Sequence, residues 1–199
     1  TGKKAGAEPE QNIIKSGKDF EAQEEVESRL QPSHIKGGNH MAVTVFEEWL
    51  NACSGCEIAI LNIGDALVDV LPHLNFVHIT PLIDHKFFGQ NGEKTSLDVP
   101  EAVVGILSGG IRNDEQEHIL KEARKKTTFL IALGTCACYG GIPAQANMWK
   151  NEEVFEKVYR HSPSTGSSPD PKDPSVPVMT PTCAALDEFV KVDIKIPGC

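Results

Sequence analysis

The chain has 199 residues, and 19 Lys and Arg against 28 Asp and Glu give it a formal net charge of −9 at pH 7. This length suits one sizeable core, and the negative charge disfavours nucleic acid and acidic membranes as partners, because both are polyanions. The chain contains no run of about 18 apolar residues, and its N-terminus has neither an apolar signal region nor a twin-arginine pair. We therefore expect a cytoplasmic protein without membrane insertion.

Residues 1–40 are polar and contain the Gly37-Gly38-Asn39 break, with one weakly helical stretch over residues 20–30. Such a composition buries little core. We expect an N-terminal arm or tail over residues 1–40, either a solvated linker or a segment that folds on a partner subunit. The main domain is expected over residues 41–199.

From residue 41 onward, short apolar runs alternate with amphipathic stretches. Asn113 and Gln116 have the spacing of a helix N-terminal capping box, and Lys125 and Lys126 suit the last turn of the same helix. Ser, Pro and Asp residues make 162–177 a loop. Hydrophobic periodicity predicts strands over 42–49, 76–82, 102–107, 128–133 and 192–196, and helices over 58–71, 113–126 and 152–160.

This alternation of short buried strands and helices predicts an α/β fold with a parallel sheet covered by helices on both faces. In such sheets, ligands bind beyond the carboxyl ends of the strands. The positions just after the strands are therefore where a functional site is expected.

Cysteines follow three of the predicted strands. Cys53-Ser54-Gly55-Cys56 comes directly after the first strand, Cys136 follows Gly134 at the end of another, and Cys199 follows the last strand. Because parallel strands end at one edge of the sheet, we expect Cys53, Cys56, Cys136 and Cys199 to converge there. Four thiolates are the ligand set of a [4Fe–4S] cluster.

Two further cysteines, Cys138 and Cys183, are left without a role in this arrangement. Cys138 lies only two residues after Cys136, so ligation by both is cramped, whereas Cys183 is expected to be a small buried residue. Six cysteines spread over the chain do not fit a small disulfide scaffold. They are expected to be thiols in a reducing compartment.

Two other interpretations of the cysteines stay open at this point. A structural zinc site uses four cysteines, although these sites usually combine two close Cys pairs and only one is present here. A thioredoxin-type dithiol also lies at a strand-to-helix turn, but it leaves Cys136 and Cys199 without a function.

Glu57 follows the second cysteine directly, and two roles are possible for it. It is either a carboxyl group that passes protons near the cluster, or the partner of Ser54 in a helix capping box. The seven histidines show no metal-ligand spacing, so we assign them no role.

Three linked motifs in this chain resemble the small subunit of [NiFe] hydrogenases. They are Glu48 to Cys56, then Gly134-Thr135-Cys136-Ala137 with Gly140 to Ala144, and finally Ile196 to Cys199. The likeness covers about residues 41–199. It implies a flavodoxin-like domain with one [4Fe–4S] cluster on Cys53, Cys56, Cys136 and Cys199, docked on a large subunit that holds the Ni–Fe centre. The motifs are most similar to those of cytosolic members that pass electrons to NAD(P), to a heterodisulfide reductase or to a flavin-based bifurcating assembly.

The resemblance implies an oxidoreductase subunit that relays electrons between the Ni–Fe site of its partner and further iron–sulfur or flavin subunits, without bond chemistry of its own. Three alternatives remain. A related cluster subunit of respiratory NADH:quinone oxidoreductase ends its site in a similar Pro-Gly-Cys, but carries adjacent cysteines in the first motif, whereas Cys53 and Cys56 are separated. The others are an FMN-binding flavodoxin-like protein and a zinc-stabilised module.

Overall fold

The computed structural model describes residues 42–80, 82–164, 168–171 and 173–199. The predicted arm over residues 1–40 lies outside these ranges, so it and its boundary stay predictions. Within the described ranges, no helix is long and apolar enough to cross a membrane.

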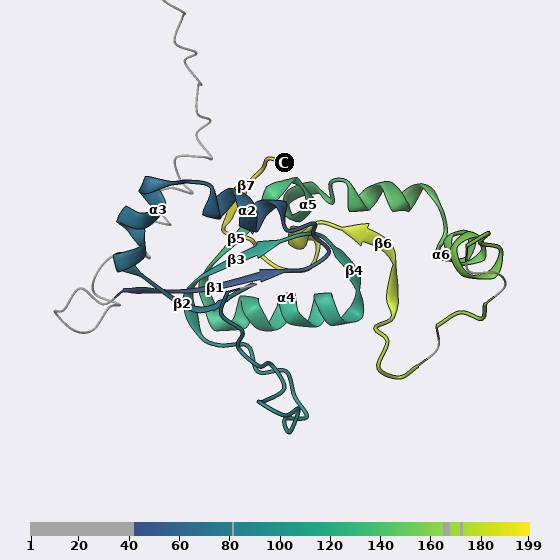
Figure 1. Ribbon diagram of the computed structural model, residues 1–199, viewed down its shortest axis with the longest axis horizontal. Coiled ribbons are helices and arrows are strands. Elements are labelled where there is room, and N and C mark those ends of the chain that lie inside the picture. The colour runs from purple at the N-terminus through teal and green to yellow at the C-terminus, as the bar shows by residue number, and fades with distance from the viewer. Residues whose placement is uncertain (1–41, 81, 165–167, 172) are drawn as a thin grey trace, which may run out of the picture. The chain divides into compact units, whose positions relative to one another are not determined.

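Five parallel strands form the central sheet, in the order β2-β1-β3-β5-β7 (Figure 1). Numbered along the chain, this is the 2-1-3-4-5 order of flavodoxin-like folds. The predicted flavodoxin-like α/β fold is confirmed. The strands are β1 (Val43–Trp49), β2 (Leu74–Ile79), β3 (Ala102–Ser108), β5 (Thr127–Leu133) and β7 (Ile194–Ile196).

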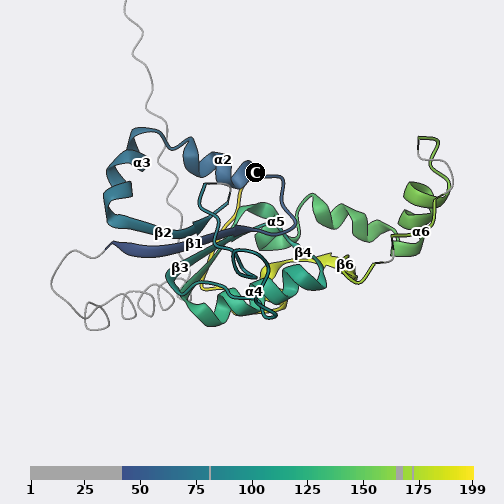
Figure 2. The same cartoon turned by 60° about the horizontal axis from the view of Figure 1, so that its bottom comes forward.

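Helices cover the two faces of this sheet. The two helices α2 (Gly55–Leu61) and α3 (Asp65–Val70) lie on one side, and α4 (Asp114–Lys126) lies on the other (Figure 2). Fully buried side chains of the strands and α4, such as Phe46, Leu107, Leu120 and Leu130, form the core. The apolar runs of the sequence therefore form the strands whose side chains make up this core.

One predicted helix is wrong. The apolar spacing of Ile60, Ile63, Leu67 and Leu71 predicted a continuous helix over 58–71, but the chain leaves the helix after Leu61 and starts α3 only at Asp65. Gly64, between them, has a φ of +73°, a conformation that glycine adopts without strain and that interrupts a helix. Ile63 and Leu71 are consequently exposed.

The N-terminal capping box of α4 is confirmed. Asn113 Oδ1 accepts the backbone N–H of Gln116 at 2.8 Å, and Gln116 Oε1 accepts the backbone N–H of Asn113 at 3.2 Å. Acidic residues occupy the first turn and basic residues the last, as the helix dipole favours. The ends of this helix are therefore encoded locally.

A second, antiparallel sheet was not predicted. It pairs β4 (Ile111–Asn113) with β6 (Met179–Ala184), which lie far apart in the sequence. The predicted helix over 152–160 corresponds to α6 (Asn151–Phe155) and a π-helical turn over Glu156–Arg160. Short helices also include α5 (Gly134–Tyr139) and 3₁₀ turns over Leu71–His73, Pro143–Met148 and Leu186–Glu188.

Candidate functional site

The four predicted site cysteines lie beyond the carboxyl ends of the central strands. Cys53 is in the loop after β1, Cys56 in the first turn of α2, Cys136 in the first turn of α5 after β5, and Cys199 after β7. The chain runs from β1 to β2 on one side and then to β3 on the other, so the loop after β1 stands at the switch point of the sheet.

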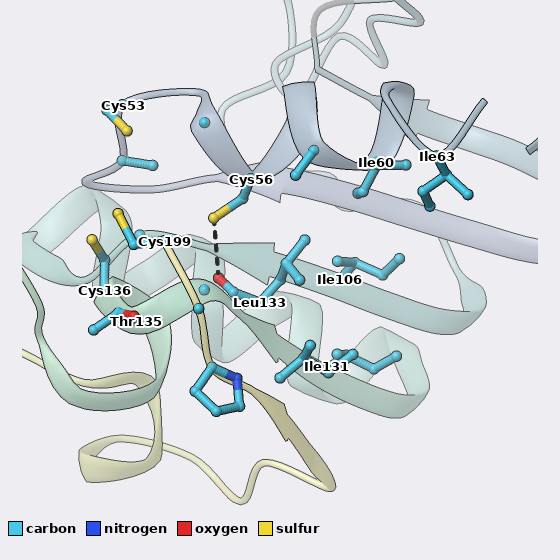
Figure 3. A pocket seen from close by; sticks show the side chains of 18 residues that line it. Cys53, Cys56, Ile60, Ile63, Ile106, Ile131, Leu133, Thr135, Cys136 and Cys199 are labelled. Carbon is cyan, nitrogen blue, oxygen red and sulfur yellow. Dashed lines mark hydrogen bonds between the residues drawn. The ribbon is translucent and has the colours of Figure 1, made fainter. Parts of the chain in front are cut away.

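A cavity of about 600 Å³ is lined by all four of these cysteines. Figure 3 shows the sulfur atoms gathered at one end of it, while Ile60, Ile63, Ile106 and Ile131 line the other end. Cys138 and Cys183 do not line the cavity. The structure thus brings together the four predicted cysteines and separates the two that were left over.

Glycines make room for the cysteine sulfurs. A Cβ atom at Gly134, whose φ is +86°, would overlap the Sγ of Cys56. A Cβ atom at Gly141, with a φ of +55°, would lie 2.9 Å from the Sγ of Cys136. Because side chains at these two positions would collide with the sulfurs, the space around the thiols depends on glycine at both.

Hydrogen bonds tie the strand ends together around the cavity. The backbone N–H of Thr135 donates to the carbonyl of Gly198 at 2.9 Å, which joins the start of α5 to the segment after β7. The thiol of Cys56 donates to the carbonyl of Leu133 at 3.7 Å (Figure 3). These contacts place Cys56, Cys136 and Cys199 with respect to one another.

The cavity opposes ionisation of free thiols. Burial, followed by the charges of Glu57 and of the other three cysteines, raises the pKa of Cys56 to about 11. The pKa of Cys136 is also raised, first by burial and then by the charges of Cys53 and Cys199. Each ionised thiol would raise the pKa of the others, so four thiolates in this cavity require a positively charged centre among them.

The four thiols surround a space and do not converge on one point. Within the part of the chain that the structure describes, no three His, Cys, Asp or Glu side chains are grouped so that they could hold a single metal ion. Together with the volume of the cavity, this arrangement suits a group larger than one ion.

Glu57 does not form the predicted capping box, and that expectation is wrong. Ser54 has a left-handed φ of +66° and its side chain caps no backbone N–H, while Glu57 is turned inward and only 4% exposed. There its Oε1 accepts a hydrogen bond from the hydroxyl group of Ser108. The alternative role of Glu57 in proton transfer stays a prediction.

The two remaining cysteines are buried in other surroundings. The thiol of Cys138 donates to the carbonyl of Ala132 at 3.4 Å, and the sulfur of Cys183 accepts the side-chain amide of Asn51 at 3.7 Å. Both side chains are at most 3% exposed. Each therefore occupies the place of a small buried residue.

Sequence reasoning missed Glu47 and Ser108. Glu47 is fully buried in β1 and Ser108 ends β3, close to Glu57. The available signal was the pair of adjacent acidic residues Glu47 and Glu48 in a mostly apolar strand, since a buried carboxyl group needs a specific partner. Gly141 lies within the Gly140 to Ala144 motif, and the structure adds that it leaves room for the Sγ of Cys136.

Comparison with known proteins agrees with this geometry. A subunit of the F420-non-reducing hydrogenase vhu of Methanocaldococcus jannaschii is 38% identical over 160 residues, which cover 80% of this chain and 51% of that protein. The iron-sulfur subunit of the F420-non-reducing hydrogenase of Archaeoglobus profundus is 35% identical over 172 residues, covering 80% of this chain and 52% of that protein. The chain therefore spans about half the length of these curated relatives.

Among solved structures, a chain of an NAD+-reducing [NiFe]-hydrogenase in the H2-reduced state matches with a TM-score of 0.68 and 28% identity, covering 79% of this chain and 83% of that one. The resemblance to hydrogenase subunits predicted from the sequence motifs is thus confirmed. The sequence profile of the family described as NADH ubiquinone oxidoreductase, 20 Kd subunit, matches residues 53–199, which include all four cavity cysteines. The chain belongs to the NADH ubiquinone oxidoreductase 20 Kd subunit family.

Proposed function

We propose that this chain is the electron-transferring small subunit of a [NiFe] hydrogenase and holds one [4Fe–4S] cluster on Cys53, Cys56, Cys136 and Cys199. The observation that carries the proposal is the convergence of these four cysteines, from three strand ends, on one cavity. The names of the relatives support it, since they are hydrogenase subunits and one is an iron-sulfur subunit.

The cavity fits an iron–sulfur cluster better than a single zinc ion. Its four sulfurs border a common space, and Gly134 and Gly141 leave room beside two of them. Zinc instead needs four ligand atoms about 2.3 Å from one point, an arrangement that the described cysteines do not form. A flavin fits less well, because the loop after β1 is Ala52-Cys53-Ser54-Gly55-Cys56 and offers few groups for a phosphate.

When bound, such a cluster supplies a site that accepts and releases one electron at a time. The chain's own residues hold and shield it. The four thiolates anchor it to three strand ends, and the hydrogen bond from Thr135 to Gly198 maintains the spacing of two of these ends. Ile106 and Ile131 keep one wall apolar, and burial of this kind adjusts a reduction potential.

A large subunit with the Ni–Fe centre is the partner in this proposal, and further iron–sulfur or flavin subunits receive the electrons. Apolar side chains exposed on the elements that carry the cysteines support a protein partner here. Ile58 on α2 is 54% exposed, Tyr139 on α5 is 63% exposed, and Ile142 just after α5 is 66% exposed.

In this proposal the chain is an oxidoreductase subunit without a bond-forming centre of its own. None of the six cysteines is paired in a disulfide, which suits the reducing cytoplasm.

A second candidate function is the cluster subunit of a respiratory NADH:quinone oxidoreductase. The description of the matching family favours it. The separation of Cys53 from Cys56 by two residues favours the hydrogenase, because the respiratory subunits carry adjacent cysteines in that motif.

Affinity purification of the full chain from its native cells, without oxygen, tests the proposal. We expect a nickel-containing partner and H2-dependent reduction of a viologen dye. Cys56→Ala should abolish dye reduction through this chain, whereas Cys183→Ala, which alters a cysteine outside the cavity, should leave it intact. A complex without nickel that oxidises NADH with quinone would support the second candidate instead.

A further inference from the structure

Arg112 in β4 is the one buried Lys or Arg side chain among the residues that the structure describes. It is 9% exposed, and three glutamates, Glu47, Glu48 and Glu57, are buried as well. A guanidinium group stays charged inside proteins, and a buried Arg is normally paired with a carboxylate. The partners of Arg112 therefore decide whether its charge is neutralised.

The guanidinium group of Arg112 binds neutral acceptors. Its Nη1 donates to the backbone carbonyl of Thr180 in β6, and its Nη2 donates to the side-chain oxygen of Asn151 at the start of α6. Asn151 Nδ2 donates to the same Thr180 carbonyl at 3.0 Å. None of the ion pairs formed by the described residues involves Arg112. Its positive charge is thus not neutralised by a carboxylate of this part of the chain.

Arg112 lies close to the cysteine site along the chain. The central strand β3 ends at Ser108, at the edge of the sheet where the cysteines gather, and β4 follows it. Gly110, between the two strands, packs against the site, because a Cβ atom there would lie 3.0 Å from the Sγ of Cys183 and 3.7 Å from the carbonyl oxygen of Cys136. Two residues of extended chain span about 7 Å, so the backbone of Arg112 lies within that distance of Gly110.

The charge of Arg112 acts on the surroundings of Cys136. Burial is the first cause that raises the pKa of Cys183; the hydrogen bond from Asn51 and then the charge of Arg112 lower this pKa, and the charge of Cys136 raises it. Cys183 is thus within electrostatic range of both Arg112 and Cys136. Because Arg112 is buried, salt screens its charge much less than it screens an exposed one.

We propose that the charge of Arg112, which no carboxylate neutralises, raises the reduction potential of the iron–sulfur group on Cys53, Cys56, Cys136 and Cys199, an inference that rests on the proposed function. Reduction adds one negative charge to a group that four thiolates already make negative. A fixed positive charge nearby stabilises the reduced form more than the oxidised form. Arg112 thus favours uptake of the electron without touching the group that receives it.

A purely structural role for Arg112 is the alternative, since its guanidinium group also joins β6 to the start of α6. Two variants disturb these contacts and keep the charge. Asn151→Ala removes one acceptor of Arg112 and one donor to Thr180, and Arg112→Lys loses the planar fork that reaches two acceptors. Arg112→Gln does the opposite, because it removes the charge and keeps an amide donor for the Thr180 carbonyl.

A redox titration of the anaerobically purified full chain, followed by EPR at fixed pH and ionic strength, measures the effect. We expect a lower midpoint potential in Arg112→Gln, and potentials close to that of the wild type in Arg112→Lys and Asn151→Ala. Lys121→Met controls for a positive charge lost at the surface, since the Lys121 side chain is 47% exposed and pairs with Glu117, and it should leave the potential unchanged. If Arg112→Gln does not fold, Arg112→Met takes its place with the same expectation.

An unchanged midpoint potential in Arg112→Gln, or a shift of equal size in Asn151→Ala, would overturn the inference. Iron and sulfide content is measured on the same samples. A wild-type chain without iron would contradict the proposed function and the inference with it. A chain that holds iron and sulfide but whose potential does not depend on the charge of Arg112 would contradict the inference alone, so the two failures are distinguishable.

Discussion

The backbone N–H of Thr135 donates a 2.9 Å hydrogen bond to the carbonyl of Gly198, and through it the residues before Cys136 and Cys199 are joined directly. The two cysteines are 63 positions apart in the sequence (199 − 136), yet each follows a residue in this bond. β7 has only three residues, so its pairing with β5 is short. The hydrogen bond from Thr135 to Gly198 adds a further contact that places the segment after β7. The site depends on such backbone contacts between strand ends as much as on the thiols.

Gly134→Ala should remove most of the bound iron. The added Cβ would overlap the Sγ of Cys56, and the φ of +86° adds a backbone cost of about 1–2 kcal/mol. Gly92→Ala is the matched control, since Gly92 has a φ of +73° but no atom lies within 4 Å of the position that its new Cβ would take. Iron analysis and urea denaturation of both variants check this. Equal iron content in the two would show that the space beside Cys56 is not needed.

Asp193→Asn should loosen β7 and weaken iron binding. The Asp193 side chain is 3% exposed, accepts the backbone N–H of Leu130 at 2.9 Å and pairs with Arg124. Loss of these charged hydrogen bonds should lower the free energy of unfolding by about 1.5–3 kcal/mol. Asp187→Asn breaks only the exposed pair with Lys195 and should cost less than about 1 kcal/mol. The account fails here if both variants unfold at the same urea concentration.

Glu47→Gln should flatten the pH dependence of stability. The pKa of Glu47 rises from 4.5 to about 8 on folding, so the folded chain binds a proton that the unfolded chain lacks between these values. This contribution to stability is fully present below about pH 4.5 and is lost as the pH rises to about 8, at up to about 1.4 kcal/mol per pH unit. Urea denaturation from about pH 5 to 8 compares the two proteins. Parallel profiles would contradict the raised pKa.

Asn113→Ala should lower the free energy of unfolding by about 1 kcal/mol, because Asn113 Oδ1 caps the N-terminus of α4. Asn91→Ala is the control, since Asn91 donates to Glu93 through its backbone N–H, which alanine retains. Thermal denaturation should separate the two variants. An unchanged melting temperature for Asn113→Ala would mean that the cap contributes little to this helix.

Much of this architecture could be predicted because its signals are local. The strands coincide with apolar runs, α4 begins at its capping box, and the cysteines follow strands whose ends meet at one edge. The continuous helix over 58–71 failed because Ile60, Ile63 and Leu67 keep helical spacing across Gly64, and periodicity does not register a positive φ.

Features that depend on distant pairing were not predictable. The antiparallel pairing of Ile111 with Ala184 joins segments 73 positions apart (184 − 111), and no spacing rule brings them together. Likewise, Ser54 and Glu57 have the spacing of a capping box, but Glu57 instead accepts a hydrogen bond from the hydroxyl of Ser108, which lies at the end of β3. Sequence spacing therefore predicts where helices and strands begin and end, but it says little about which distant side chains they contact.

Iron and acid-labile sulfide analysis of the anaerobically purified chain tests the central claim most directly. The account predicts about four irons and four sulfides per chain in the wild type and in Cys183→Ala, and neither in Cys56→Ala. A colourless wild-type protein with a single zinc ion, or a Cys56→Ala variant that keeps its iron and sulfide, would contradict it.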